Sequence, residues 1–183
     1  MSVKVELDKK ILDTAHNLFA NAREQVGRAA GVAINRTLVS LRKEASVSIR
    51  QRYVIKAGTV KNTFTLRRAG RSSTRGALLS KGAVLDLSNF RLRKPKRGPM
   101  RVQVLKAGGL KPVKGLFSHK GRRPMMRTTA APYPLRIPQG PSVPQMFGNE
   151  ETLQELAPKA EKILNKRFLH EIVYRYKKIH GRN

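Results

Sequence analysis

The chain contains no cysteine and no tryptophan among its 183 residues, and only 5% of the residues are aromatic. Without cysteine there can be no disulfide and no thiolate metal site, which fits a reducing compartment. Apolar runs are also short. None approaches the roughly 18 residues that cross a bilayer, and the first ten residues, MSVKVELDKK, lack the apolar core of a signal peptide. We therefore expect a protein that is neither embedded in a membrane nor secreted by the usual route.

Carboxylates are scarce. The chain has 11 Asp and Glu against 39 Lys and Arg, and nearly all of the acids fall near its two ends. Nucleases and polymerases usually cluster carboxylates around divalent metals, and this distribution offers no such cluster. The four histidines lack metal-ligand spacing, and no Gly-rich loop followed by Lys-Ser or Lys-Thr is present to hold a nucleotide phosphate. We expect no enzyme, and no catalytic residue, metal, cofactor or small-molecule substrate.

The cationic excess is concentrated in the middle of the chain. Residues 51–140 hold 22 Lys or Arg and one carboxylate, Asp86, for a net charge of +21 out of +28. The first 50 residues contribute +4 and the last 43 contribute +3. Because such an excess raises the self-repulsion of a compact chain, we expect a polyanionic partner to offset it. Nucleic acid phosphate is the commonest such partner.

The length suits a single domain, and its predicted class is α+β: an N-terminal helix pair and a C-terminal helix packed on a small, mostly antiparallel sheet, with long basic loops and a Pro-rich extended segment. Three zones make up this domain of residues 1–183: a helical zone at 1–50, a basic strand and loop zone at 51–140 with a Pro-rich end, and a linker with the C-terminal helix at 141–183.

The helical zone follows from apolar residues at helical spacing over 7–26 and again over 30–45. Gly27 and Gly31 stand between these runs and predict either two helices or one helix bent there. In the last zone, Asn149 is expected to cap a helix that begins with acidic residues. Pro158 is expected to open a second helix, and Gly181 to end it.

The middle zone alternates short β-forming segments with basic, Gly-containing connectors. The predicted strands are Thr63–Leu66, Ala83–Leu87, Met100–Leu105, Gly115–Phe117, Met125–Thr129 and Leu135–Ile137. Residues 67–76 and 91–99 are expected to form long basic loops. The prolines from Pro132 to Pro144 exclude a regular helix or a central strand, so they predict an extended, stiff connector.

Three clusters of cations are the candidate phosphate-binding residues. They are Arg67, Arg68, Arg71 and Arg75; Arg91, Arg93, Lys94, Lys96, Arg97 and Arg101; and Lys120, Arg122 and Arg123. Aromatic residues are scattered rather than grouped for base stacking, so we expect contact with a nucleic acid backbone without sequence choice. Asp86, the one acid of the zone, is expected to pair with an arginine across the sheet.

The order of these segments resembles the minor tail protein Z family of long-tailed bacteriophages and prophages. The resemblance covers essentially the whole chain, and its most telling pieces are Ala33-Ile34-Asn35-Arg36, Pro134-Leu135-Arg136-Ile137-Pro138 and Pro144-Gln145-Met146-Phe147. It implies a small α+β protein of the head-proximal tail end, assembled as rings that are often hexameric, which takes part in tail completion and head–tail joining. The family offers no catalytic residues and no DNA-ligand motif to transfer.

The expected partners are therefore copies of the chain itself, neighbouring tail or connector proteins, and the end of a double-stranded DNA genome. The expected location is the virion tail, with assembly in the host cytoplasm. Two alternatives remain open. One is an RNA-packing or ribosomal-like protein, for which such charge is ordinary. The other is an adaptor whose basic zone docks only on acidic patches of portal or tail rings.

Overall fold

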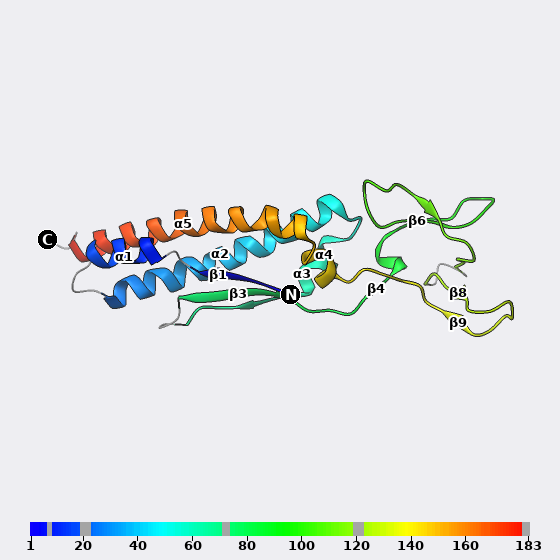
Figure 1. Ribbon diagram of the computed structural model, residues 1–183, viewed down its shortest axis with the longest axis horizontal. Coiled ribbons are helices and arrows are strands. Elements are labelled where there is room, and N and C mark those ends of the chain that lie inside the picture. The colour runs from blue at the N-terminus through cyan, green and yellow to red at the C-terminus, as the bar shows by residue number, and fades with distance from the viewer. Residues whose placement is uncertain (7–8, 19–22, 71–73, 119–122, 181–183) are drawn as a thin grey trace.

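The computed structural model describes residues 1–6, 9–18, 23–70, 74–118 and 123–180. It confirms the predicted α+β class: long helices pack on a small antiparallel sheet, and further short strands lie beyond them. Figure 1 shows an elongated molecule with the long helices at one end and the segments around β6, β8 and β9 at the other. None of the described helices is both long and apolar enough to cross a lipid bilayer.

The frame of the molecule is a pair of long helices, α2 (Arg23–Arg52) and α5 (Glu150–His180). Contacts run in opposite directions along the two: Gln25 meets Arg175, and Ser48 meets Glu155, so the helices are antiparallel. Each helix turns a mostly apolar stripe inward. The buried apolar residues are Val26, Ala29, Ala30, Ala33, Ile34, Leu38, Leu41, Ala45 and Ile49 on α2, and Leu156, Ala160, Leu164, Phe168 and Ile172 on α5.

The sheet beside α2 has the strand order β1-β3-β2, with both pairs antiparallel. Its strands are β1 (Ser2–Glu6), β2 (Phe64–Arg67) and β3 (Arg75–Ser80). Helix α2 packs directly against the central strand at Gly76. A Cβ at that position would lie 2.7 Å from Ile34 Cγ2 and 2.9 Å from Leu38 Cδ1. Both side chains are fully buried, so the close approach of helix and sheet depends on glycine.

Two shorter helices complete this part of the fold, α1 (Lys9–Leu18) and α3 (Ala57–Asn62). A third, α4 (Val143–Phe147), leads into α5, and a capping box between Ser142 and Gln145 begins it. Its Phe147 is fully buried, and the Phe147 ring meets Phe64 edge to face at 5.1 Å. Asn149 accepts a hydrogen bond from the Glu151 N–H at 3.1 Å, which confirms the predicted cap of α5.

Residues 85–140, here called the extension, leave the sheet after β3 and return at α4 (Figure 1). Their strands pair as β5-β6-β7, β8-β9 and β10-β4, all antiparallel. The bounds are β4 (Leu85–Asp86), β5 (Arg91–Arg93), β6 (Arg101–Gln103), β7 (Lys111–Pro112), β8 (Met126–Arg127), β9 (Leu135–Arg136) and β10 (Gln139–Gly140), with a 3-10 turn at Leu87–Asn89.

Several predictions about helices were wrong. The first residues are not helical, because Ser2–Glu6 forms β1. Helix α2 begins at Arg23 and continues through Gly27 and Gly31, so the interpretation of two helices meeting there was wrong. Pro158 does not open a helix. It lies inside α5, exposed, while the buried stripe continues on both sides of it. At the glycines and at Pro158, the packing of α2 and α5 against each other outweighs the cost of these residues inside a helix, about 1 kcal/mol for Gly and about 3 kcal/mol for Pro.

The strand predictions were right in place for most segments and too long in extent. Gly115–Phe117 forms no strand, only a bridge between Phe117 and Met125. The central strand β3 (Arg75–Ser80) was missed, and its first two residues were assigned to the basic loop of residues 67–76. The two basic loops were also too broad, since Arg75 begins β3 and Arg91 and Arg93 form β5. The Pro-rich segment includes the short strands β9 and β10 and opens α4 with Pro144 in its first turn. Gly181 lies outside the described residues.

Candidate nucleic-acid interface

The structure separates the predicted cations into two surfaces. Arg67, Arg68 and Arg75 lie at one end of the β1-β3-β2 sheet, whereas the cluster from Arg91 to Arg101 lies in the extension. Figure 1 places the β3 end and β6 on opposite sides of the N-terminus. Arg71, Lys120 and Arg122 lie outside the described residues. A single continuous site made of all three clusters is therefore not what the described part of the chain forms.

In the extension, a flat cationic face arises from strand register. Arg93 lies directly opposite Arg101, and Arg91 lies opposite Gln103. Residues paired across a sheet share a face, so the three arginines point to one side. Leu92 and Val102 point to the other, where Val102 is buried. We call Arg91, Arg93 and Arg101 the arginine platform.

The arginine platform has no negative partner among the described residues. Lys94, Lys96 and Arg97 follow it in the loop between β5 and β6, and none of these six side chains makes an ion pair or a hydrogen bond to the described part of the chain. All six are exposed. Like charges directly opposite in a sheet are destabilising, so the Arg93–Arg101 pair favours binding of an anion that neutralises both.

Asp86 does pair with an arginine, Arg123, at 3.5 Å. Arg123 comes from the segment before β8 rather than from a neighbouring strand, so the expected pairing across the sheet is replaced by one between a strand and a loop. Asp86 is the one carboxylate in residues 85–140. Its pairing with Arg123 leaves no acid in the extension to neutralise the arginine platform.

The second surface is a hollow on the outer face of the β1-β3-β2 sheet, with a volume of about 370 Å³. Lys4, Ala77 and Arg67 form one row across the three strands, and the small Ala77 leaves the space between the two cations. Arg68 and Arg75 line the same hollow, but Arg75 is ion-paired with Glu6. Lys4 was missed by sequence reasoning. The alternation of SVKVE, with Val3 and Val5 turned toward the helices, was the signal that could have found it.

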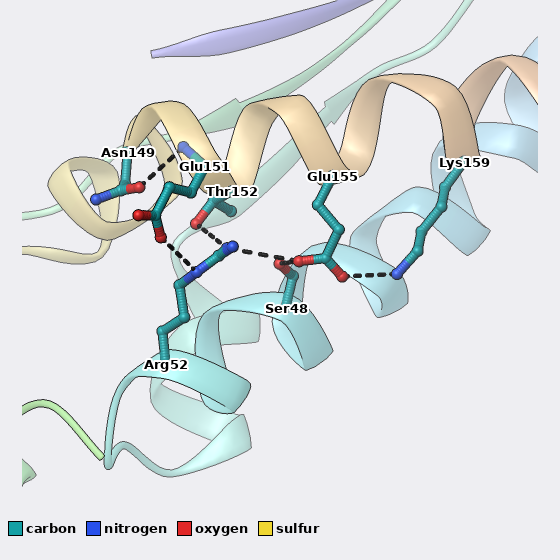
Figure 2. Close-up of polar contacts among 7 residues, drawn as sticks. All are labelled: Ser48, Arg52, Asn149, Glu151, Thr152, Glu155 and Lys159. Atoms are coloured by element: carbon teal, nitrogen blue, oxygen red, sulfur yellow. Dashed lines mark hydrogen bonds and ion pairs between the residues drawn. The ribbon is translucent and has the colours of Figure 1, made fainter. Parts of the chain in front are cut away.

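The base of the extension is tied to the helix frame at Arg52. The Lys106 N–H donates to the Arg52 carbonyl at 2.8 Å, and the Val54 N–H donates to the Val104 carbonyl at 2.8 Å. The Arg52 side chain reaches back to the first turns of α5, where Nε lies 3.1 Å from Glu151 Oε2 and Nη1 donates to Thr152 Oγ1 at 3.1 Å (Figure 2). The same residue therefore joins α2, α5 and the extension.

Glu155 is the centre of this polar cluster (Figure 2). Its carboxylate accepts hydrogen bonds from Lys159 Nζ at 2.7 Å and from the buried Ser48 Oγ at 2.7 Å, and Arg52 lies 3.5 Å away. The hydrogen bond from Lys159, then that from Ser48, lowers the pKa of Glu155 below its ordinary value of 4.5, against an opposing effect of burial. The ionised form is thus the one that the fold stabilises.

A pH dependence of stability follows from this cluster. A carboxyl whose pKa is lower in the folded state stabilises the fold above its unfolded pKa, and this contribution is lost as the pH falls through that value toward the folded pKa. Glu155→Gln should therefore reduce the free energy of unfolding at pH 7 more than at pH 3, as measured by urea titration. Glu161→Gln, an exposed site on the same helix, is the matched control. An equal effect of Glu155→Gln at both pH values would contradict this prediction.

Two of the three segments that carry the family resemblance, Ala33–Arg36 and Pro144–Phe147, lie in the helix frame, whereas residues 134–138 lie at β9 in the extension. Ala33 and Ile34 are fully buried. Asn35 holds the backbone of Ala69 through two hydrogen bonds, at 3.0 and 2.8 Å, and Arg36 is ion-paired with the buried Glu171 of α5. No protein-family model, curated protein or solved structure matches the chain. Within the ranges that the structure describes, no three His, Cys, Asp or Glu side chains gather as metal ligands would.

Proposed function

We propose that this chain is a structural virion protein at the head-proximal end of a long phage tail. It forms an oligomeric ring in tail completion and head–tail joining, and it contacts the end of the genome through the extension. The family resemblance of the frame segments supports the tail assignment. The arginine platform supports the contact with DNA, and it is the observation that carries the proposal.

The arginine platform suits a nucleic acid backbone because it offers positive charge but no exposed aromatic side chain that could recognise a base. Three guanidinium groups share one face of a short sheet, and each can donate two parallel hydrogen bonds to two oxygens of a phosphate. Phe90, the aromatic residue beside the platform, is buried and cannot stack on a base. Affinity then comes from counterion release at the phosphates and is independent of sequence.

The helix frame suits the role of a ring subunit. The extension lies at the opposite end of the molecule from the C-terminal end of α5 (Figure 1), so the cations can face a lumen while the frame contacts its neighbours. Leu169 and Val173, on α5, are 60% and 51% exposed, and exposed apolar side chains one helical turn apart are typical of contact surfaces. A ring would multiply modest contacts of each subunit through avidity.

The proposal is tested by the salt dependence of DNA binding together with imaging. We expect two unrelated duplexes to bind equally well, with a log–log salt slope steeper than about −2.7, since three platform contacts supply about −0.9 each. Electron micrographs should show closed rings. Preference for RNA without rings would favour the RNA-packing alternative, and binding only to acidic portal or tail proteins would favour the adaptor. Either result would overturn the proposed contact with DNA.

A further inference from the structure

The β1-β3-β2 sheet has an open edge at β1, whose single strand neighbour in the described chain is β3. The Ser80 N–H donates to the Met1 carbonyl at 3.2 Å. From this pair onward, hydrogen-bonded and non-hydrogen-bonded residue pairs alternate along β1 and β3. Val3 and Val5 therefore exchange hydrogen bonds with β3. The N–H and C=O groups of Ser2, Lys4 and Glu6 point away from the sheet, as a template for one more strand.

Beside this edge runs a groove of about 420 Å³ between β1 and α5. On the helix side it is lined by Ala157, Ala160 and Leu164, with Glu161 and Asn165 beside them. Ala160 and Leu164 are buried, and Ala157 is exposed. Figure 1 shows β1 and β3 side by side along the helix pair. The groove thus has small apolar side chains on the inner side of the sheet, where an added strand would turn every second residue.

The widths of the two layers differ by about one strand. Two packed helices, each about 10 Å across, cover about 20 Å. Three strands spaced about 4.8 Å apart cover roughly 14 Å. Helix α2 contacts all three strands of the sheet, whereas α5 lines the groove beside β1. One further strand at the β1 edge would bring the sheet to the width of the helix layer.

We propose that the β1 edge binds an extended segment of an acidic partner protein as a fourth strand. Residues of that segment opposite Val3 and Val5 would be apolar and would face Ala160 and Leu164. A residue opposite Lys4 would be acidic and would face solvent beside it. Lys4 lines the same hollow as Arg67 and Arg68, so the outer face of the sheet beside the β1 edge is cationic and favours an acidic strand there. This surface is separate from the arginine platform and does not depend on DNA binding.

The test uses a short synthetic peptide of alternating Val and Glu with the full-length protein. Binding is followed by fluorescence anisotropy at physiological salt and by amide hydrogen exchange. On binding, the Lys4 and Glu6 N–H groups should gain protection, whereas those of Val3 and Val5 are already bonded to β3. The same peptide with N-methyl groups on the amides of one edge keeps its charge but cannot pair, and it should bind at least about tenfold more weakly.

Variants at Lys4 separate pairing from charge. Lys4→Pro removes an outward N–H while leaving the ladder to β3 intact, since proline is tolerated on the free side of an edge strand. It should weaken peptide binding at least about tenfold relative to Lys4→Thr, which loses the same charge but keeps the N–H. The proposal would be overturned by equal peptide binding of these two variants or by equal binding of the N-methylated and unmodified peptides. Protection of the Lys4 and Glu6 N–H groups by self-association in the absence of peptide would also overturn it.

Discussion

Replacing Arg91, Arg93 and Arg101 together by glutamine should reduce the log–log salt slope of DNA binding by about 2.7. Each phosphate contact contributes about 0.9 to the slope. At 0.1 M salt the same loss corresponds to a decrease in affinity of roughly two to three orders of magnitude. The effect is this large because the described residues of the extension provide no carboxylate that already neutralises these arginines. The measurement is a fluorescence titration of a labelled duplex at several salt concentrations.

The control for this variant has the same net charge but changes the frame. Lys162, Lys166 and Lys177 are exposed on α5, and their replacement by glutamine also removes three positive charges. It should change the salt slope by much less, since counterions are released only where side chains meet phosphates. If both triple variants flatten the slope equally, affinity follows net charge and the platform has no special part. Unfolding curves of both variants should match the unchanged protein, because all six side chains are exposed.

The second large effect concerns the buried aromatic residue of α4. Phe147→Ala should lower the free energy of unfolding by about 3–5 kcal/mol, the range for large-to-small changes of fully buried aromatic residues. The Phe147 ring is inaccessible to solvent and packs on Phe64 with an interplanar angle of 77°. Since domains of this size are stable by only about 5–15 kcal/mol, the variant would be close to unfolding. Urea titration at neutral pH measures the change.

A conservative variant separates lost packing from lost shape at this position. Phe147→Leu keeps most of the apolar volume and should cost clearly less than Phe147→Ala. At a temperature where the alanine variant remains folded, its log–log salt slope of DNA binding should equal that of the unchanged protein. The reason is that the arginine platform lies in the extension and not in α4. A loss below about 1 kcal/mol for Phe147→Ala would contradict the packing of a fully buried Phe147 on Phe64.

Local chemistry was sufficient to predict part of the architecture. The apolar spacing of α2 and α5 places their helices, because a stripe of that width has to be buried. The cap at Asn149 follows from a short-range hydrogen bond within two residues. Most strands of the middle zone were located, although the structure trims several of them to two or three residues. In these cases the decisive interaction lies within a few residues of the position it determines.

Other features depended on residues far apart in the chain. Strand β3 contains no β-branched residue, and it forms because β1 and β2 pair on its two sides and α2 packs on Gly76. The helix at Pro158 continues because residues on both sides of it pack into one core. These are contacts between distant segments, whose energies exceed the local preferences that sequence patterns express.

The amino-acid sequence by itself determined that the chain is a strongly cationic α+β protein whose excess charge lies in residues 51–140. Charges can be counted along a sequence, and apolar periodicity can be read from it. Tertiary structure alone decided which cations lie on the same face. The register of β5 and β6 brings Arg91, Arg93 and Arg101 onto one face, while Arg67 and Arg75 join Lys4 on another sheet. The physical reason is that cations close in sequence lie near one another, but the pairing register of the strands decides toward which face of the sheet their side chains point.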